Sequence, residues 1–208
     1  MFPCKLCQTE DCSPIPSGRR RTFLHCSHCG LVFVPEAEWP SPQAERARYD
    51  HHDNTPANAG YLRFLHEVVA RVEALNLGAA PILDFGCGEQ AVLTTLLSER
   101  GFTCDGYDPL YGRDRLGGPY GLVILCEVIE HIRDLRGELT RLSALLHANG
   151  KILVRTRLYP SVEQIANWWY SRDLTHINFF AEETIGHAAR LAGKNAVTRL
   201  AEDMFVLE

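Results

Sequence analysis

The sequence predicts an α/β fold whose centre is a doubly wound, mostly parallel sheet, with a small cysteine-rich unit ahead of it. Apolar segments with strand character alternate with segments of helical spacing from residue 81 onward. Half of the eight cysteines lie in the first 26 residues. A chain of 208 residues has room for one such domain and a small appendage. We therefore expect a metal-binding unit at 1–35, a linker at 36–58 and the sheet domain at 59–208.

The composition is that of a globular protein, with 46% hydrophobic and 23% charged residues. No segment is apolar enough to span a membrane, and the N-terminus lacks the pattern of a secretory leader. We expect a cytoplasmic protein with no membrane partner. The net charge of −5 and the pI of about 6.0 do not favour broad nucleic-acid binding, although Arg19, Arg20 and Arg21 make the N-terminal segment mildly basic.

Two Cys-x-x-Cys pairs stand in the N-terminal unit, Cys4 with Cys7 and Cys26 with Cys29. Each pair can form a tight knuckle, and four thiolates close a tetrahedral zinc site with no open position. The apolar run after the second pair predicts a strand, as in zinc ribbons. The other interpretation is a group of buried or redox-active thiols. A structural zinc would stabilise a segment too small for its own core, and the ribbon could also contact a protein partner.

The linker is rich in proline and polar residues, with one short helix expected at Gln43–Tyr49. The spacing of apolar residues then predicts an amphipathic helix over 59–76. Strands are expected at 81–85, 102–108, 121–127 and 151–156, with helices at 90–101 and 135–150 and two short strands within 195–208.

The loop after the first of these strands carries Asp84, Gly86, Cys87 and Gly88. In an open α/β sheet, ligands bind at the carboxyl ends of the strands. A nicotinamide or flavin site would favour a third glycine, and a carboxylate such as Asp84 repels a diphosphate but suits a cationic ligand. Asp108 ends the next strand, where an acid can accept hydrogen bonds from both ribose hydroxyls. These features indicate a nucleoside without diphosphate that carries an amino acid, which describes S-adenosylmethionine.

With "LDFGCG" and "GYDP" in this order, the chain resembles the class I S-adenosylmethionine-dependent methyltransferases, which have a Rossmann-like sheet. The resemblance implies that the glycine loop contacts the methionine end of the cofactor, that Asp108 holds the ribose and that Glu127 covers the cofactor. The cysteine pairs ahead of the domain resemble those of bacterial methyltransferases with a zinc ribbon. Residues 109–119 are too few for the helix and strand that the family usually has there, so we expect a loop.

The segment "CEVIEH" places Glu127, Glu130 and His131 at i, i+3 and i+4 directly after a buried strand. If Glu127 begins a helical turn, the three side chains share one face. His176, in the aromatic segment "WWYSRDLTHINFF", is a candidate fourth ligand. Glu127, Glu130, His131 and His176 resemble the pattern of the metal-dependent 2′-O-methyltransferases of small-RNA 3′ ends, and ubiquinone-pathway O-methyltransferases carry a similar segment. Carboxylates with imidazoles suit Mg or Mn.

The function that we expect is O-methylation of a hydroxyl group, on a small molecule or on an RNA end, with assistance from a divalent metal. Glu130, His131 and His176 are the expected catalytic residues. Three alternatives remain open at this stage. The protein could be an RNA 2′-O-methyltransferase, a metal-independent small-molecule enzyme in which a histidine is the general base, or a non-catalytic zinc-ribbon adaptor.

Overall fold

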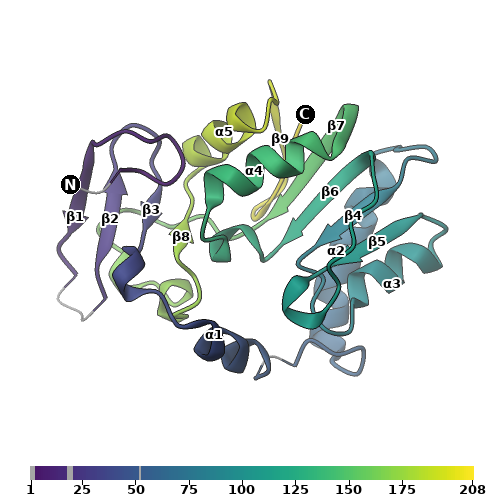
Figure 1. Cartoon of the computed structure of the whole chain (residues 1–208), viewed down its shortest axis with the longest axis horizontal. Coiled ribbons are helices and arrows are strands. Elements are labelled where there is room, and N and C mark those ends of the chain that lie inside the picture. The colour runs from purple at the N-terminus through teal and green to yellow at the C-terminus, as the bar shows by residue number, and fades with distance from the viewer. Residues whose placement is uncertain (1–2, 18–20, 52) are drawn as a thin grey trace.

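The computed structural model describes residues 3–17, 21–51 and 53–208, which form two sheets (Figure 1). The larger sheet has the strand order β5-β4-β6-β7-β10-β9. Its strands, in chain order, are β4 (Ile82–Phe85), β5 (Cys104–Tyr107), β6 (Tyr120–Cys126), β7 (Leu146–Arg155), β9 (Val197–Ala201) and β10 (Met204–Leu207).

Four adjacent strands of this sheet, β5, β4, β6 and β7, are parallel, which confirms the predicted fold class. β4 lies between β5 and β6, and β6 pairs with β7, all in parallel register. β10 is antiparallel to both β7 and β9. Because parallel strands end at the same edge, the loops after β4, β5, β6 and β7 meet there.

Helices cover both faces of the sheet. The apolar side chains of α2 (Ala59–Ala74) and α3 (Val92–Glu99) pack with one face, and those of α4 (Leu135–Ala144) and α5 (Glu182–Leu191) pack with the other. α2 begins where the Asn58 side chain accepts hydrogen bonds from the backbone N–H groups of Gly60 and Tyr61. The sequence analysis did not assign α5, although Ile185, Ala188 and Ala189 follow a helical stripe.

The predicted helix over 135–150 is too long, because α4 ends at Ala144 and β7 starts at Leu146. The segment "LHANG" has the composition of a helix end with a glycine stop. In the fold it instead starts a long strand in which Leu146 is the register partner of Tyr120. The backbone bonds of this pairing outweigh the local helix propensity.

The N-terminal unit forms a sheet that continues into the second half of the chain. Its strands β1 (Cys12–Ile15), β2 (Phe23–Cys26) and β3 (Val32–Phe33) are joined by β8 (Asn178–Phe179), in the order β1-β2-β3-β8. Figure 1 shows β8 as the element beside the ribbon strands. Cys12 lies in β1 opposite Cys26. The ribbon is therefore part of a shared sheet.

The linker contains a 3-10 turn (Glu36–Glu38) and the helix α1 (Pro42–Tyr49), close to the expected helix. Ser41 caps α1 by accepting a hydrogen bond from the backbone N–H of Ala44. Residues 109–119 form a loop that contains one 3-10 turn (Pro109–Tyr111), as expected. Across residues 3–17, 21–51 and 53–208, no helix combines the length and the apolar character that crossing a bilayer requires.

We predict that Phe179→Ala lowers the free energy of unfolding by about 3–5 kcal/mol. Phe179 in β8 is fully buried and packs edge-on against Phe23 of the ribbon, with ring centroids 5.8 Å apart. Urea denaturation measures the change. The matched control is Trp169→Ala, which removes a side chain from a residue that is 61% exposed and should cost no more than about 0.5 kcal/mol. Equal effects of the two substitutions would contradict the shared core.

Candidate active site

A cleft of about 630 Å³ opens at the carboxyl edge of the sheet, where the fold brings the loops together. It is bordered by α1 through Tyr49 and by α2 through Tyr61. Glu130 is fully buried and lies beneath this surface. The predicted site residues that line the cleft are Asp84, Gly86, Cys87, Gly88, Asp108, Glu127, His131 and His176.

The glycine loop needs glycine for two reasons. Gly86 and Gly88 have φ angles of 77° and 70°, in the left-handed region that favours glycine. A Cβ added at Gly86 would lie 2.5 Å from a methyl group of Val128, whereas a Cβ at Gly88 would meet no atom within 4 Å. The backbone of Gly86 is therefore held against the segment that follows β6, and the loop presents its main chain to the cleft.

Asp108 is fixed by two backbone groups. Its carboxylate accepts hydrogen bonds from the N–H of Gly88 at 3.0 Å and from the N–H of Leu110 at 3.1 Å. Burial raises the pKa of this carboxyl, and the two bonds oppose that rise. A carboxylate held in this way still has lone pairs that can accept two ribose hydroxyls.

Asp84 lies deeper, at the end of β4, and accepts a hydrogen bond from the Thr94 hydroxyl at 2.7 Å. Burial raises the pKa of the Asp84 carboxyl to about 6. The bond ties the strand end to α3. Asp84 therefore forms part of the floor of the cleft.

The Glu-x-x-Glu-His segment does not form the expected helical turn. Glu127 has a φ of 54°, so the backbone reverses there, and a 3-10 turn (Ile129–His131) follows. The ligand atoms of Glu130, His131 and His176 all lie within 4.8 Å of one another. Glu127 lies beside this cluster but outside it. The structure thus brings together three of the four predicted ligands.

Tyr170 connects the two carboxyl groups, a role that the sequence analysis did not foresee. It begins the 3-10 turn Tyr170–Arg172, and its hydroxyl donates to Glu127 at 3.0 Å and contacts Glu130. Thr156 donates to the other oxygen of Glu130 at 3.1 Å. Burial raises the pKa of the Glu130 carboxyl to about 8, and the nearby Glu127 adds to the rise. A phenol among aromatic core residues carries no sequence signal for this contact.

Both imidazoles of the cluster are oriented by backbone carbonyls. His131 Nδ1 lies 3.0 Å from the carbonyl oxygen of Thr175, and His176 Nδ1 lies 2.8 Å from that of Tyr170. Because a carbonyl only accepts, each Nδ1 is assigned the proton, and each Nε2 carries the lone pair. Burial and the neighbouring His176 lower the pKa of His131 to about 3, so this ring is neutral. A neutral imidazole with an anchored Nδ1–H is the form that binds metal ions.

The four N-terminal cysteines form a second cluster. Cys4 Sγ lies 3.5 Å from Cys29 Sγ, and Cys7 Sγ lies 3.6 Å from Cys26 Sγ. A tetrahedral zinc with bonds of about 2.3 Å would place its sulfurs about 3.8 Å apart. The hydrogen bond with Cys29 lowers the pKa of Cys4 to about 5 and raises that of Cys29. The donor set and its spacing fit zinc.

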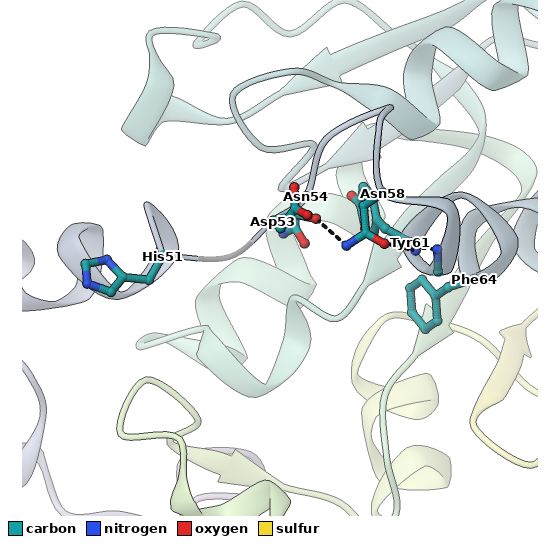
Figure 2. Close-up of a pocket in the computed structure, with 7 residues that line it drawn as sticks. His51, Asp53, Asn54, Asn58, Tyr61 and Phe64 are labelled. Carbon is teal, nitrogen blue, oxygen red and sulfur yellow. Dashed lines mark hydrogen bonds between the residues drawn. The ribbon is translucent and has the colours of Figure 1, made fainter.

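A shallower hollow of about 510 Å³ adjoins the cleft and shares Asn54, Tyr61 and Phe64 with it. Figure 2 shows these side chains with Asn58, whose amide donates to the backbone oxygen of Asp53 at 2.9 Å. The hollow lies between the linker and the start of α2. It widens the approach to the cleft from this side.

A comparison with models of protein families agrees with the methyltransferase-like fold described above. A family model described as a methyltransferase domain matches residues 49–198. The chain belongs to this family. The match confirms the predicted assignment to the S-adenosylmethionine-dependent methyltransferases and covers the glycine loop, Asp108 and the Glu-x-x-Glu-His segment.

A ubiquinone biosynthesis O-methyltransferase of Bradyrhizobium diazoefficiens is 29% identical over an alignment of 147 residues, with coverage of 58% of this chain and 57% of that protein. The chain thus matches somewhat more than half the length of this relative.

Two solved structures share the fold. An O-methyltransferase family protein from Burkholderia thailandensis aligns with a TM-score of 0.59 at 18% identity, over 83% of this chain and 64% of the other. The 1,6-didemethyltoxoflavin-N1-methyltransferase of the same organism, with its substrate and S-adenosylhomocysteine bound, aligns with a TM-score of 0.54 at 17% identity, over 94% and 97%.

We predict that Gly86→Ala destabilises the protein more than Gly88→Ala does. Both changes place alanine at a left-handed φ, which costs about 1–2 kcal/mol, but only the first adds a clash with Val128. Thermal unfolding of the two variants gives the comparison. The double variant Gly86→Ala, Val128→Ala should regain part of the stability that Gly86→Ala loses, because it removes the clashing methyl groups. Equal melting temperatures for the two single variants would contradict the close approach at Gly86.

Proposed function

We propose that this chain transfers the methyl group of S-adenosylmethionine to a hydroxyl oxygen of a small molecule, with a divalent ion held by Glu130, His131 and His176. The observation that carries the proposal is the convergence of these three side chains, with their ligand atoms within 4.8 Å, at the cofactor cleft. Nitrogen and oxygen ligands of this kind suit Mg or Mn rather than a thiolate-preferring ion.

The cleft supports the cofactor part of the proposal. Gly86 and Gly88 expose backbone to the methionine end, and Asp108 is oriented to accept the ribose hydroxyls. One oxygen of Glu127 is buried and has no hydrogen-bond partner among the described residues. A buried acceptor without a donor is costly, so a hydroxyl or amino group of a bound ligand would satisfy it.

S-adenosylmethionine supplies an activated methyl group, and a divalent ion, when bound, supplies a positive charge that lowers the pKa of an acceptor hydroxyl. The contribution of the protein is mainly positioning. The carbonyls behind His131 and His176 fix both rings, and Tyr170 and Thr156 fix the Glu130 carboxyl. Glu130 must lose its proton before it can bind a cation.

Two observations weigh against the alternatives. His131, with its pKa lowered to about 3 by burial and by His176, is a poor general base at neutral pH, so the metal-independent alternative depends on His176 as the base. For an RNA acceptor, Arg19 and Arg20 lie outside the described residues, and the Arg21 guanidinium donates to backbone carbonyls of this chain. A small-molecule acceptor is in keeping with a cleft of about 630 Å³ and with the O-methyltransferase relative. The cofactor residues that line the cleft support binding of the cofactor, and a product assay separates turnover from an adaptor that only binds it.

We predict that Glu130→Gln and His131→Ala each reduce methyl transfer to catechol-type diols at least about 100-fold and abolish Mn²⁺ binding. The affinity for S-adenosylhomocysteine should change less than about threefold, because neither side chain belongs to the glycine loop. Calorimetry measures both ligands, and formation of S-adenosylhomocysteine measures turnover. Glu73→Gln, at an exposed helix position, is the control. Unchanged turnover in both variants and in the presence of a chelator would overturn the metal proposal.

We predict that Mn²⁺ affinity rises with pH below about 8 and levels off above it. Burial raises the pKa of Glu130 to about 8, so at lower pH the ion must displace a proton from this carboxyl. The Mn²⁺ affinity rises with pH because only the ionised carboxylate binds the ion. Well below the pKa, the affinity should increase about tenfold per pH unit. Titrations at pH 6, 7 and 8 measure it. An affinity that is flat over this range would show that Glu130 is not the displaced acid.

A further inference from the structure

Residues 171–176 form an irregular loop that carries His176 to the cluster. It contains the end of one 3-10 turn and no strand. His176 Nδ1 bonds to the backbone carbonyl of Tyr170, the residue directly before this loop. The position of the imidazole therefore depends on what holds the loop as a whole.

The ribbon holds this loop through one side chain. Arg21 precedes β2, and its guanidinium donates hydrogen bonds to four carbonyl oxygens of the loop. One nitrogen donates to Ser171 and Asp173, each at 2.7 Å, and the other to Leu174 at 3.1 Å and to His176. A planar fork with several fixed donors can join carbonyls that point to one centre, which a lysine cannot do. Burial lowers the pKa of Arg21 to about 10, so the group remains charged at neutral pH.

A ladder of backbone bonds runs in parallel with this contact. Val34, after β3, donates its N–H to the oxygen of Ile177 at 3.0 Å, and Ile177 donates to the oxygen of Glu130 at 2.9 Å. The ribbon strand, the residue after His176 and the turn of Glu130 are thus bonded in series. Cys26 ends β2 and Cys29 lies in the turn before β3, so the thiol cluster closes the hairpin at the start of this series.

The far side of the loop is held by α1. Two guanidinium nitrogens of Arg48 contact Oδ2 of Asp173, at 2.9 and 2.7 Å, and Oδ1 of Asp173 accepts from the Thr175 hydroxyl at 2.7 Å. This pair is partly exposed at Arg48, so it is screened by water and salt. The Arg21 contact is partly buried and is the less screened of the two.

We propose that Arg21 is a positioning residue of the active site: it fixes the 171–176 loop so that His176 meets Glu130 and His131. Through Arg21, the ribbon then helps to set the geometry of the metal site. This inference rests on the proposed function for its catalytic consequence, but the ordering of the loop can be measured without any ligand. The hydrogen bonds of Arg21 described above do not involve the glycine loop or Asp108. The affinity for the cofactor should therefore not depend on Arg21 and is an internal control.

The test compares Arg21→Ala with the zinc-loaded wild-type chain in three measurements. We expect amide hydrogen exchange of residues 171–177 to accelerate at least tenfold, while β4 and β6 keep their protection. Mn²⁺ affinity should fall at least tenfold. The kcat for diol methylation should fall while the affinity for S-adenosylhomocysteine stays within twofold. Arg21→Lys keeps the positive charge but lacks the planar guanidinium with its several donors, so it should show the same changes with smaller magnitude. It takes the place of Arg21→Ala in the test if Arg21→Ala does not fold.

The matched control is Arg136→Ala. Arg136 in α4 also bonds across to the ribbon, donating to the Leu6 carbonyl at 3.0 Å, but it is not among the residues bonded to the loop. The Arg136→Ala variant should leave the amide hydrogen exchange of residues 171–177 and the Mn²⁺ affinity unchanged. Unaltered loop exchange in Arg21→Lys, or equal acceleration in Arg136→Ala, would overturn the inference. If the wild-type chain binds no Mn²⁺, the metal part of the proposed function fails, and the exchange data still decide the role of Arg21.

Discussion

The burial of the Glu130 carboxyl is the constraint on which the candidate site depends. A buried carboxylate without a partner is costly by several kcal/mol, so it must be protonated or meet a cation. Tyr170 and Thr156 bond its two oxygens, and the imidazoles of His131 and His176 lie next to it with their Nδ1 atoms bonded to backbone carbonyls. Burial and the neighbouring Glu127 favour the protonated acid without a metal, against the opposing effect of the Tyr170 and Thr156 hydrogen bonds. The same surroundings provide a ligand set when a metal replaces the proton.

The described part of the chain contains two candidate metal sites of different chemistry, joined by one sheet. The thiols of the ribbon suit zinc and offer four ligands, which leaves no position for a substrate. The cluster of Glu130, His131 and His176 offers three, next to the cleft, which leaves positions open. The β3–β8 pairing places the structural site and the open one in a single hydrogen-bonded framework. We propose that the thiol site supplies rigidity and the open site supplies chemistry, with the shared sheet connecting the two.

Much of this architecture is predictable from the sequence because it rests on local signals. Apolar periodicity and glycine positions predicted the parallel strands, α2, α3 and the loop at Gly86. The spacing of the cysteines alone predicted that four of them form one cluster. Long-range contacts carry no such signal. The pairing of β3 with β8, the bridge made by Tyr170 and the contacts of Arg21 join segments more than 40 residues apart. The expected helical turn at Glu127 failed because its left-handed backbone is imposed by the surrounding fold.

The central claim is that Glu130, His131 and His176 form one cation site beside a bound nucleoside. The most direct measurement is a crystal structure of the chain with S-adenosylhomocysteine and Mn²⁺, using anomalous scattering to locate the ion. The account predicts a manganese peak within bonding distance of all three side chains, with the nucleoside along the glycine loop and its ribose on Asp108. A cleft that holds the nucleoside while these three side chains share no anomalous peak would contradict it.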